Sequence, residues 1–568
     1  MGGPPPPPPS ARPAPVDEPD AAPSTDDSVT RYLCAAAHLD ASFADQVIAE
    51  YLVEPARAVP PSPGVDAGAV LREALAARSR RKTRDAVLLL LLLVMAVFSF
   101  LWLLIWALIG FGVAFLSALL PDRVRGLLAG VGVLAGLALA LGNWRYLGTS
   151  LTFVAFLFSG RADPQVGAIV GLIASVAIAA IVAADEGAVW HVTRAQFRHS
   201  MFLADARRAP KGWVRQFRTF GHANHQRELD RAAAADARSR VPDGSAGVTV
   251  HRGRVPFVGA GNVVLNEVLA LPLVPDDDAT EKPEPFTAAE LQAHVAEVLG
   301  KLRSSGSLSP GGRLASLQIT EEVFVPAEQL LRRTGTSLGP TILPNDRRPP
   351  VRHIPLETAR DLADRPQEAA RYYRCYRVES WDRELTTSSY FTAGTDSRTL
   401  YVEWTHCVLP PLREQFRSID RHTDNGPFTT FLETLNALPL TVPVRVVGVF
   451  RTLEPLPHDP DAIEPARYGA GRSLRELAAA QRPGVFFQEA DAVRYMTILE
   501  QAFFAAVQSF LESRHYSVDD VLGAAKAKIS NSITIQNGTF HNSAIGIGSV
   551  RQERKGPTIT LPGRKEES

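Results

Sequence analysis

Apolar residues dominate one continuous block of this chain, residues 86–184, and only short polar breaks interrupt it. A transmembrane helix needs about 20 apolar residues to cross the hydrocarbon core of a bilayer. The block therefore predicts an integral membrane protein with an α-helical transmembrane bundle. Its polar breaks separate four apolar runs: residues 86–120, 126–142, 146–158 and 166–184.

The first run leaves two arrangements open. As one straight helix it would extend roughly 52 Å, well beyond a hydrocarbon core of about 30 Å. It can form a hairpin of two short crossings, with run 146–158 lying at the outer interface, or each of the four runs can cross once. Both arrangements give about four spans. We favour the hairpin because it keeps Arg123 and Arg125 in the cytoplasm.

Basic residues stand on both sides of the apolar block, which predicts that both termini are cytoplasmic in a multi-pass protein of the plasma membrane. The segment Arg194–Arg218 is especially basic, so we expect it to attract anionic lipid headgroups. The flanking basic residues are Arg78, Arg80, Arg81, Lys82 and Arg84 before the block, and Arg194, Arg198, Arg207, Arg208, Lys211, Arg215 and Arg218 after it.

Small residues recur at helical spacing in the later runs. Such faces let helix backbones approach closely in lipid, and packing inside one bundle is favoured over homo-oligomer formation, which stays possible. An ionisable residue inside a run would indicate a transport path, and the runs contain none, so transport is the least favoured function. The helix-packing candidates are Gly130, Gly132, Gly136, Gly167 and Gly171.

The rest of the chain divides by composition and periodicity. Two helices, 30–54 and 65–79, are expected before the membrane, with Asp40 and Ser42 as helix-cap candidates. The predicted organisation is a disordered proline-rich and acidic tail (1–29), a helical cytoplasmic module (30–84), the transmembrane domain (85–186), a basic juxtamembrane helical segment (187–246), a cytoplasmic α+β domain (247–527), and a small β element with a disordered tail (528–568).

The α+β domain is expected to contain a mainly antiparallel sheet. The period-2 pattern of residues 399–409 is typical of a half-buried strand and directs His406 and Cys407 to opposite faces. Thr287 with Glu290, and Ser473 with Glu476, have capping-box spacing at helix starts. The other expected strands are 314–326, 372–380, 384–392 and 438–453, and the expected helices are 286–302 and 493–513.

One loop offers candidate chemistry, the segment with Pro256, Phe257, Gly259 and Gly261. Two glycines can let backbone amides approach a phosphate, or they can supply positive φ for a tight turn. The turn is favoured, because no third glycine and no Walker-type lysine follow. No cofactor motif is present, and the three cysteines lack metal-ligand spacing. Sixty acidic and sixty basic residues balance, so no nucleic acid is expected as a partner.

Several segments resemble a family of uncharacterised actinobacterial multi-pass membrane proteins to which no activity is assigned. The resemblance implies an N-terminal helical segment, a membrane hairpin or bundle, and a cytoplasmic domain. It rests on residues 32–36 (Tyr-Leu-Cys-Ala-Ala), the basic run before the membrane, residues 256–261, residues 376–381 and residues 409–413 (Leu-Pro-Pro-Leu-Arg).

These features favour a non-enzymatic, membrane-anchored scaffold or sensor with a cytoplasmic α+β domain. The alternative is a membrane-tethered enzyme or a nucleotide- or phosphate-binding protein that uses the loop at residues 256–261. No sequence motif identifies a catalytic residue or a protein partner.

Overall fold

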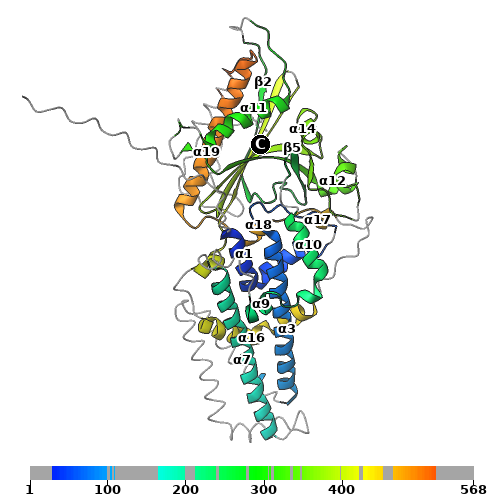
Figure 1. Cartoon of the computed structure of the whole chain (residues 1–568), viewed down its shortest axis with the longest axis vertical. Helices are drawn as coiled ribbons and strands as arrows, with labels where there is room; N and C mark the ends of the chain where they lie inside the picture. The colour runs from blue at the N-terminus through cyan, green and yellow to red at the C-terminus, as the bar shows by residue number, and fades with distance from the viewer. Residues whose placement is uncertain are drawn as a thin grey trace, which may run out of the picture.

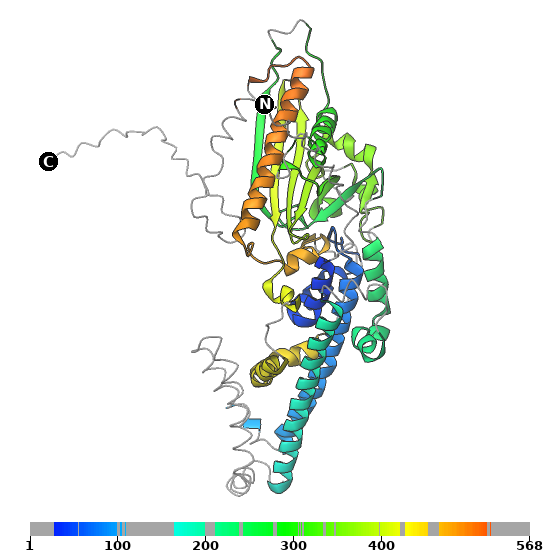
Figure 2. The same ribbon diagram turned by 60° about the vertical axis from the view of Figure 1, so that its left-hand side comes forward.

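The structure is a computed structural model that describes residues 28–98, 164–198, 211–237, 242–451 and 465–519, with short gaps inside the fourth range and single-residue breaks elsewhere, and a few isolated residues. The described part is elongated (Figure 1). A sheet domain lies at one end, a bundle of shorter helices lies in the middle, and two long helices extend away from the bundle at the other end (Figures 1 and 2).

The first helices are α1 (Ser28–Leu39), α2 (Ala41–Tyr51) and α3 (Ala67–Phe98). Asp40 divides the first predicted helix in two, because its carboxylate caps α2 by accepting hydrogen bonds from the backbone N–H groups of Ser42 (2.8 Å) and Phe43 (3.1 Å). The second predicted helix is longer than expected. α3 begins at Ala67 and continues without a break into the first apolar run.

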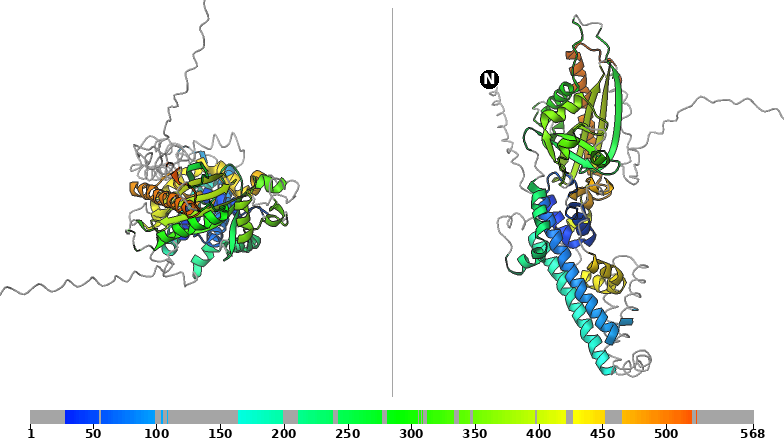
Figure 3. Two further views of the ribbon diagram at one scale, coloured as in Figure 1. Left: turned by 90° about the horizontal axis from the view of Figure 1, so that it is seen from above. Right: turned by 90° about the vertical axis from the view of Figure 1, so that its right-hand side faces the viewer.

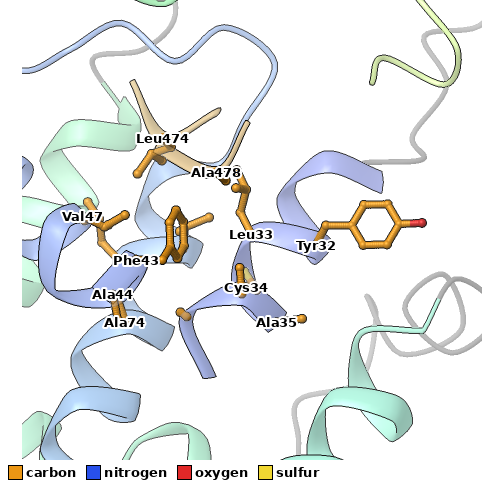
Figure 4. Close-up of a cluster of buried hydrophobic side chains, with 14 of the residues drawn as sticks. Tyr32, Leu33, Cys34, Ala35, Phe43, Ala44, Val47, Ala74, Leu474 and Ala478 are labelled. Carbon is orange, nitrogen blue, oxygen red and sulfur yellow. The ribbon is translucent and has the colours of Figure 1, made fainter. Parts of the chain in front are cut away.

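We call the bundle of α1, α2, the first half of α3, α9 (Gly212–Arg218) and α10 (Gln226–Ala237) the helical module. Its core contains Leu33, Phe43 and Val47, and Figure 4 shows Leu474 and Ala478, from a distant part of the chain, packed on the same core. The remaining helices here are α7 (Pro164–Gln196), α9 (Gly212–Arg218), η1 (His222–Asn224) and α10 (Gln226–Ala237).

Among the residues that the structure describes, one helix, Ile169–Gln196, is long and apolar enough to cross a membrane. It contains most of the predicted run 166–184. The helix continues past the run through Asp185 and Glu186, which pair with polar groups of neighbouring helices. The runs 126–142 and 146–158, with Gly130, Gly132 and Gly136, lie outside the described residues, so four spans are not shown.

A network of charged side chains joins α3 and α7 where the apolar segment of α3 begins and that of α7 ends. Asp185 accepts hydrogen bonds from Arg80 and from Arg84, the latter at 2.6 Å. Arg84 also pairs with Asp85 at 3.0 Å, and Asp85 pairs with Arg445. These side chains are mostly buried, so each charge is compensated by an opposite charge rather than by water.

The sheet domain is a mixed α+β structure with a seven-stranded sheet in the order β2-β7-β6-β5-β3-β1-β4. Neighbouring strands pair antiparallel, except that β1 and β3 are parallel, with Val248 opposite Val323. The strands are β1 (Ser245–His251), β2 (Asn262–Pro272), β3 (Leu317–Pro326), β4 (His353–Pro355), β5 (Arg371–Ser380), β6 (Leu385–Thr395) and β7 (Thr399–Leu409).

Four predicted strands, 314–326, 372–380, 384–392 and 399–409, are confirmed as β3, β5, β6 and β7. The strand expected at residues 438–453 is wrong. Its valine-rich sequence belongs to helix α16 (Pro427–Phe450), in which Phe431, Leu435 and Leu438 pack at helical spacing against α3 and α7. Tertiary packing therefore overrides the local β propensity of the valines.

Two predicted helices cover one face of the sheet, α11 (Ala288–Gly300) and α19 (Phe486–Ser513) (Figure 1, Figure 3). The expected capping box of Thr287 with Glu290 begins α11. Trp404 and Phe503 pack in the core between α19 and the sheet. The remaining elements are η2 (Lys301–Arg303), α12 (Ala327–Arg332), α13 (Gly339–Ile342), α14 (Leu356–Asp364), α15 (Glu414–Arg417), η4 (Ser418–Asp420), α17 (Pro465–Tyr468) and α18 (Leu474–Ala478).

Candidate functional site

The segment from Pro256 to Gly261, here called the glycine loop, connects β1 to β2 and packs on the sheet face opposite α11 and α19. Phe257 is buried there among aromatic rings. Its ring centroid lies 4.3 Å from that of Tyr390 and 5.2 Å from that of Phe324. Phe257 therefore fixes the loop to the sheet, and its role is packing.

Both glycines of the loop adopt the left-handed backbone region, with φ of +96° at Gly259 and +86° at Gly261, as the turn interpretation predicts. Gly261 has a further constraint. A Cβ atom at this position would lie 2.4 Å from the carbonyl oxygen of Val408 on β7. Glycine is required at residue 261 because the backbone of β7 passes so close.

The backbone amides of this loop bind a carboxylate of the chain itself. Oε1 of Glu476 accepts hydrogen bonds from the N–H groups of Gly259 and Gly261, each at 2.9 Å. Oε2 accepts the N–H of Ser473 at 2.7 Å, which completes the predicted capping box of α18. The amides that could have held a phosphate are thus occupied.

The environment of Glu476 has opposing effects on its acidity. Burial raises the pKa of this carboxyl above its ordinary value, while the three amide donors lower it, and the net shift is upward. The side chain also lines a large cavity, which is described next.

A cavity of about 1120 Å³, here called the pocket, lies beside the glycine loop. Its charged lining consists of Arg254, Arg472, Arg482 and Glu476, three guanidinium groups and one carboxylate. The polar groups of Asn262, Asn266, Thr405 and Gln481 also line it.

The lining comes from three parts of the chain. The segment before and within the glycine loop supplies Arg254 and continues into β2. The end of β7 supplies Thr405 and Leu409. The segment around α18 supplies Arg472, Glu476 and Arg482. A ligand in the pocket would therefore contact the sheet and the α18 segment together.

The α18 segment also connects the pocket to the helical module. Glu50 of α2 accepts a hydrogen bond from the N–H of Gly471 at 2.7 Å and pairs with Arg252, which follows β1. Leu474 and Ala478 are buried in the core of the helical module (Figure 4). Arg472 therefore follows Gly471, whose N–H is bound by Glu50, and precedes α18, whose apolar side chains are buried in the helical module.

Sequence reasoning identified the glycine loop and the capping box of Ser473 with Glu476, but it treated them as separate features. The structure brings them together. Arg472 and Arg482 were missed, because a single exposed arginine gives no sequence signal of a site. The one clue is local: both arginines lie within ten residues of a capping box that begins a short helix.

The buried histidine and cysteines of the sheet do not form a nucleophilic site. His406 and Cys407 lie on opposite faces, as predicted. Nε2 of His406 accepts the indole N–H of Trp404, so Nδ1 carries the proton and donates to Oγ of Ser389 at 2.7 Å. Burial lowers the pKa of His406 to about 3 and raises that of the Cys407 thiol well above its ordinary value.

The glycines predicted to pack helices and the basic residues predicted to face lipid differ in how far they are buried. Gly171 is buried in α7 next to Ala174, and Gly167 lies in the same helix. Lys211 and Arg215 are exposed, whereas Arg218 donates a hydrogen bond to the buried carboxylate of Glu73 at 2.7 Å. Among the described residues, no group of three or more His, Cys, Asp or Glu side chains is placed to hold a metal ion.

Comparison with protein families gives one match. Residues 267–544 match the AbeC-like domain, which includes most of β2, strands β3 to β7, the α18 segment and α19. Comparison with curated proteins and with solved structures gave no match. The chain therefore contains an AbeC-like domain at residues 267–544, and this domain supplies all of the pocket's lining except the lining residues between 254 and 266.

Proposed function

We propose that this protein is a membrane-anchored sensor whose cytoplasmic AbeC-like domain binds a small phosphate-bearing or other anionic molecule in the pocket. The observation that carries the proposal is the charge of the lining: three guanidinium groups face a cavity whose one carboxylate, Glu476, is already held by three backbone amides.

The arginines suit this role chemically. Arg254 and Arg472 are exposed, and among the described residues neither has a carboxylate within ion-pair distance. A guanidinium group binds phosphate and carboxylate oxygens through two parallel N–H donors. The cavity is large enough for a nucleotide-sized molecule, since small-molecule sites have volumes of about 300–1,000 Å³. The neutral polar groups of Asn262 and Gln481 would complete recognition.

The anchoring part of the proposal retains the predicted topology: about four spans in the plasma membrane, with both termini in the cytoplasm. It is supported by the candidate span Ile169–Gln196 and by the basic side chains Arg80 and Arg84 at the cytoplasmic start of the apolar part of α3. Exposed Lys211 and Arg215 remain available to anionic headgroups, whereas Arg218 is used internally.

Sensing requires that the pocket be coupled to the membrane helices, and the contacts for this exist. A ligand that binds Arg472 would shift the segment 471–478, to which Arg472 belongs. That segment is joined to α2 through Glu50 and packs into the core of α1 and α2, both of which pack on α3. Because α3 is continuous, a shift at the pocket can reach the apolar part of α3 without crossing a flexible linker.

The test measures ligand binding by the purified full chain in lipid nanodiscs. The probe is a fluorescent trinitrophenyl derivative of ATP, displaced by unlabelled ATP and by inorganic pyrophosphate. We expect saturable binding that weakens with salt. The double variant Arg254→Gln/Arg472→Gln should bind at least about tenfold more weakly, since a lost charged hydrogen bond costs about 1.5–3 kcal/mol.

The matched control is Arg332→Gln/Arg365→Gln, which removes two exposed arginines that lie in surface ion pairs on α12 and after α14. It should bind like the unmodified chain. Equal binding by both double variants, or no displaceable binding by the unmodified chain, would contradict an anion site in the pocket.

A further inference from the structure

Helix α16 has an unusual composition for a helix of a cytoplasmic domain. Glu433 and Arg445 are its only charged residues, and its last part, Thr441–Phe450, is a short apolar stretch. It belongs to the AbeC-like domain in sequence, yet it packs on α3 and α7 rather than on the sheet. Figures 1 and 2 show it running across the α3–α7 pair rather than along it.

One face of α16 is fixed to the two long helices. Leu435 and Leu438 are buried against Leu88 and Leu92 of α3, together with Ile178 of α7. This apolar contact begins within one helical turn of the charged network around Asp85. α16 therefore lies at the depth where α3 and α7 change from charged to apolar sequence.

Polar contacts hold both halves of α16 at this depth. Arg445 pairs with Asp85, and Thr434 donates a hydrogen bond to Glu186 at 3.3 Å. At the end of the helix, the carbonyl oxygen of Arg451 accepts hydrogen bonds from Arg78 and Lys82. The helix is thus attached to the cytoplasmic boundary of the apolar segment at several points.

The opposite face of α16 is apolar and exposed. Val444, Val447 and Phe450 recur at helical spacing, and Val447 has 65% of its surface exposed. The outer surfaces of α3 and α7 just beyond are exposed and apolar too, at Leu93 and Ile173. A stripe of valine and phenylalanine would be unfavourable in water, and it adjoins the surface that the proposed membrane anchoring places in lipid.

The prolines of α16 favour an interfacial position over a crossing one. Pro439 and Pro443 have no N–H group, so the carbonyl oxygens of Leu435 and Pro439 lack their helical donors. Such oxygens are costly in the hydrocarbon core but can be hydrated at the level of the headgroups. The apolar segment Thr441–Phe450 is also far shorter than the roughly 20 residues that a crossing needs.

We infer that α16 is a monotopic membrane helix: its face with Val444, Val447 and Phe450 inserts into the cytoplasmic leaflet at the boundary between headgroups and acyl chains. The inference rests on the proposed membrane anchoring and adds a second, non-spanning contact with lipid. Through α16 the AbeC-like domain itself touches the bilayer. Lys82, which is partly exposed next to its end, suits anionic headgroups at that level.

The test places a bimane fluorophore on a cysteine at one of three positions of the full chain: Val447→Cys on α16, Ile173→Cys on α7, and Val268→Cys on β2. These positions have closely similar exposed fractions, 65%, 63% and 63%. The native cysteines are buried, so the unmodified chain gives the labelling background. Each protein is reconstituted into phosphatidylcholine–phosphatidylglycerol vesicles that contain lipids with a doxyl quencher near the glycerol or deep in the acyl chain.

We expect fluorescence at residue 447 to be quenched, and more strongly by the shallow quencher than by the deep one. Residue 173 should also be quenched, and residue 268 should not. If residue 173 is quenched and residue 447 is not, the inference about α16 is overturned while membrane anchoring stands. If neither is quenched, the anchoring fails and the inference fails with it. Fluorescence at residue 447 that changes with the protein-to-lipid ratio, but not with doxyl content, would indicate a second copy on this face and would also overturn it.

Discussion

Oε1 of Glu476 lies 2.9 Å from the backbone nitrogen of Gly261, although the two residues are separated by 215 positions in the chain. This hydrogen bond joins the α18 segment to the glycine loop, and both residues line the pocket. It also explains why a loop with the composition of an anion site does not present free amides: the protein supplies the anion itself.

Replacing Glu476 by glutamine tests this contact. The amide side chain has one acceptor oxygen, so it cannot accept hydrogen bonds from both the loop amides and Ser473, and its NH₂ group would face an N–H donor. We expect Glu476→Gln to lower the free energy of unfolding by about 1–3 kcal/mol, the cost of unsatisfied buried polar groups. Chemical denaturation followed by near-ultraviolet circular dichroism measures it.

The control for Glu476→Gln is Glu297→Gln, which removes an exposed ion pair with Lys301. That change should cost less than about 1 kcal/mol. Equal effects of the two substitutions would mean that Glu476 does not hold the loop.

A second prediction concerns the room for a Cβ atom at two glycines, one of which lies in the glycine loop. Gly261 and Gly253 both have left-handed φ, +86° and +79°, but a Cβ at residue 261 would collide with the backbone of β7 while residue 253 has open space around it. We expect Gly253→Ala to cost about 1–2 kcal/mol from backbone strain alone. Gly261→Ala should cost more than about 3 kcal/mol or abolish folding, because a main-chain clash cannot relax cheaply. Thermal unfolding and the yield of folded protein compare the two, and equal costs would refute the close approach to β7.

The secondary structure of the sheet domain could be predicted because its signals are local. Alternation along β7 and the capping box of Thr287 with Glu290 lie within a few residues of each other, and these elements are confirmed. The alternation holds only in the first half of β7. From Thr405 onward both faces are buried, because the glycine loop covers the second face.

The pocket could not be predicted, because its parts meet only in three dimensions. Nothing near Arg472 indicates that Arg254 will lie across a cavity from it. The same reason explains the error at α16. Its valines favour a strand locally, while the leucines that determine its helical packing find their partners on α3 and α7, more than two hundred residues earlier in the chain.

The buried histidine of β7 predicts acid sensitivity. Burial lowers the pKa of His406 from an ordinary value of 6.5 to about 3. Below pH 6.5 the imidazole of His406 is therefore protonated in the unfolded chain but stays neutral in the folded chain. The stabilising effect is complete above pH 6.5 and is lost as the pH falls toward 3, by about 2 kcal/mol at pH 5.

The measurement for His406 is the unfolding free energy at pH 7 and at pH 5, for the unmodified chain and for His406→Gln. The variant should be less stable at pH 7, because it loses the fixed contacts with Trp404 and Ser389, but it should lose about 2 kcal/mol less between the two pH values. An unchanged pH dependence in the variant would show that other groups cause the acid sensitivity. His251, which burial holds at a pKa of about 4, is then the first group to substitute.

Asp185 makes the last prediction, because one carboxylate compensates two arginines in the network between α3 and α7. Arg80 and Arg84 are both largely buried and both donate to it. Asp185→Asn would leave the buried charge of Arg80 without its carboxylate partner, although Arg84 keeps its pair with Asp85, and breaking a buried ion pair in this way costs about 3–5 kcal/mol. Thermal unfolding in detergent should show a large decrease in the unfolding temperature for Asp185→Asn and little change for Asp361→Asn, which removes an exposed pair with Arg365.

The network also connects α3 to α16 through Asp85, so Asp185→Asn should increase the accessibility of residue 447 to a water-soluble quencher. If stability falls while that accessibility stays the same, the network holds α3 and α7 together without positioning α16.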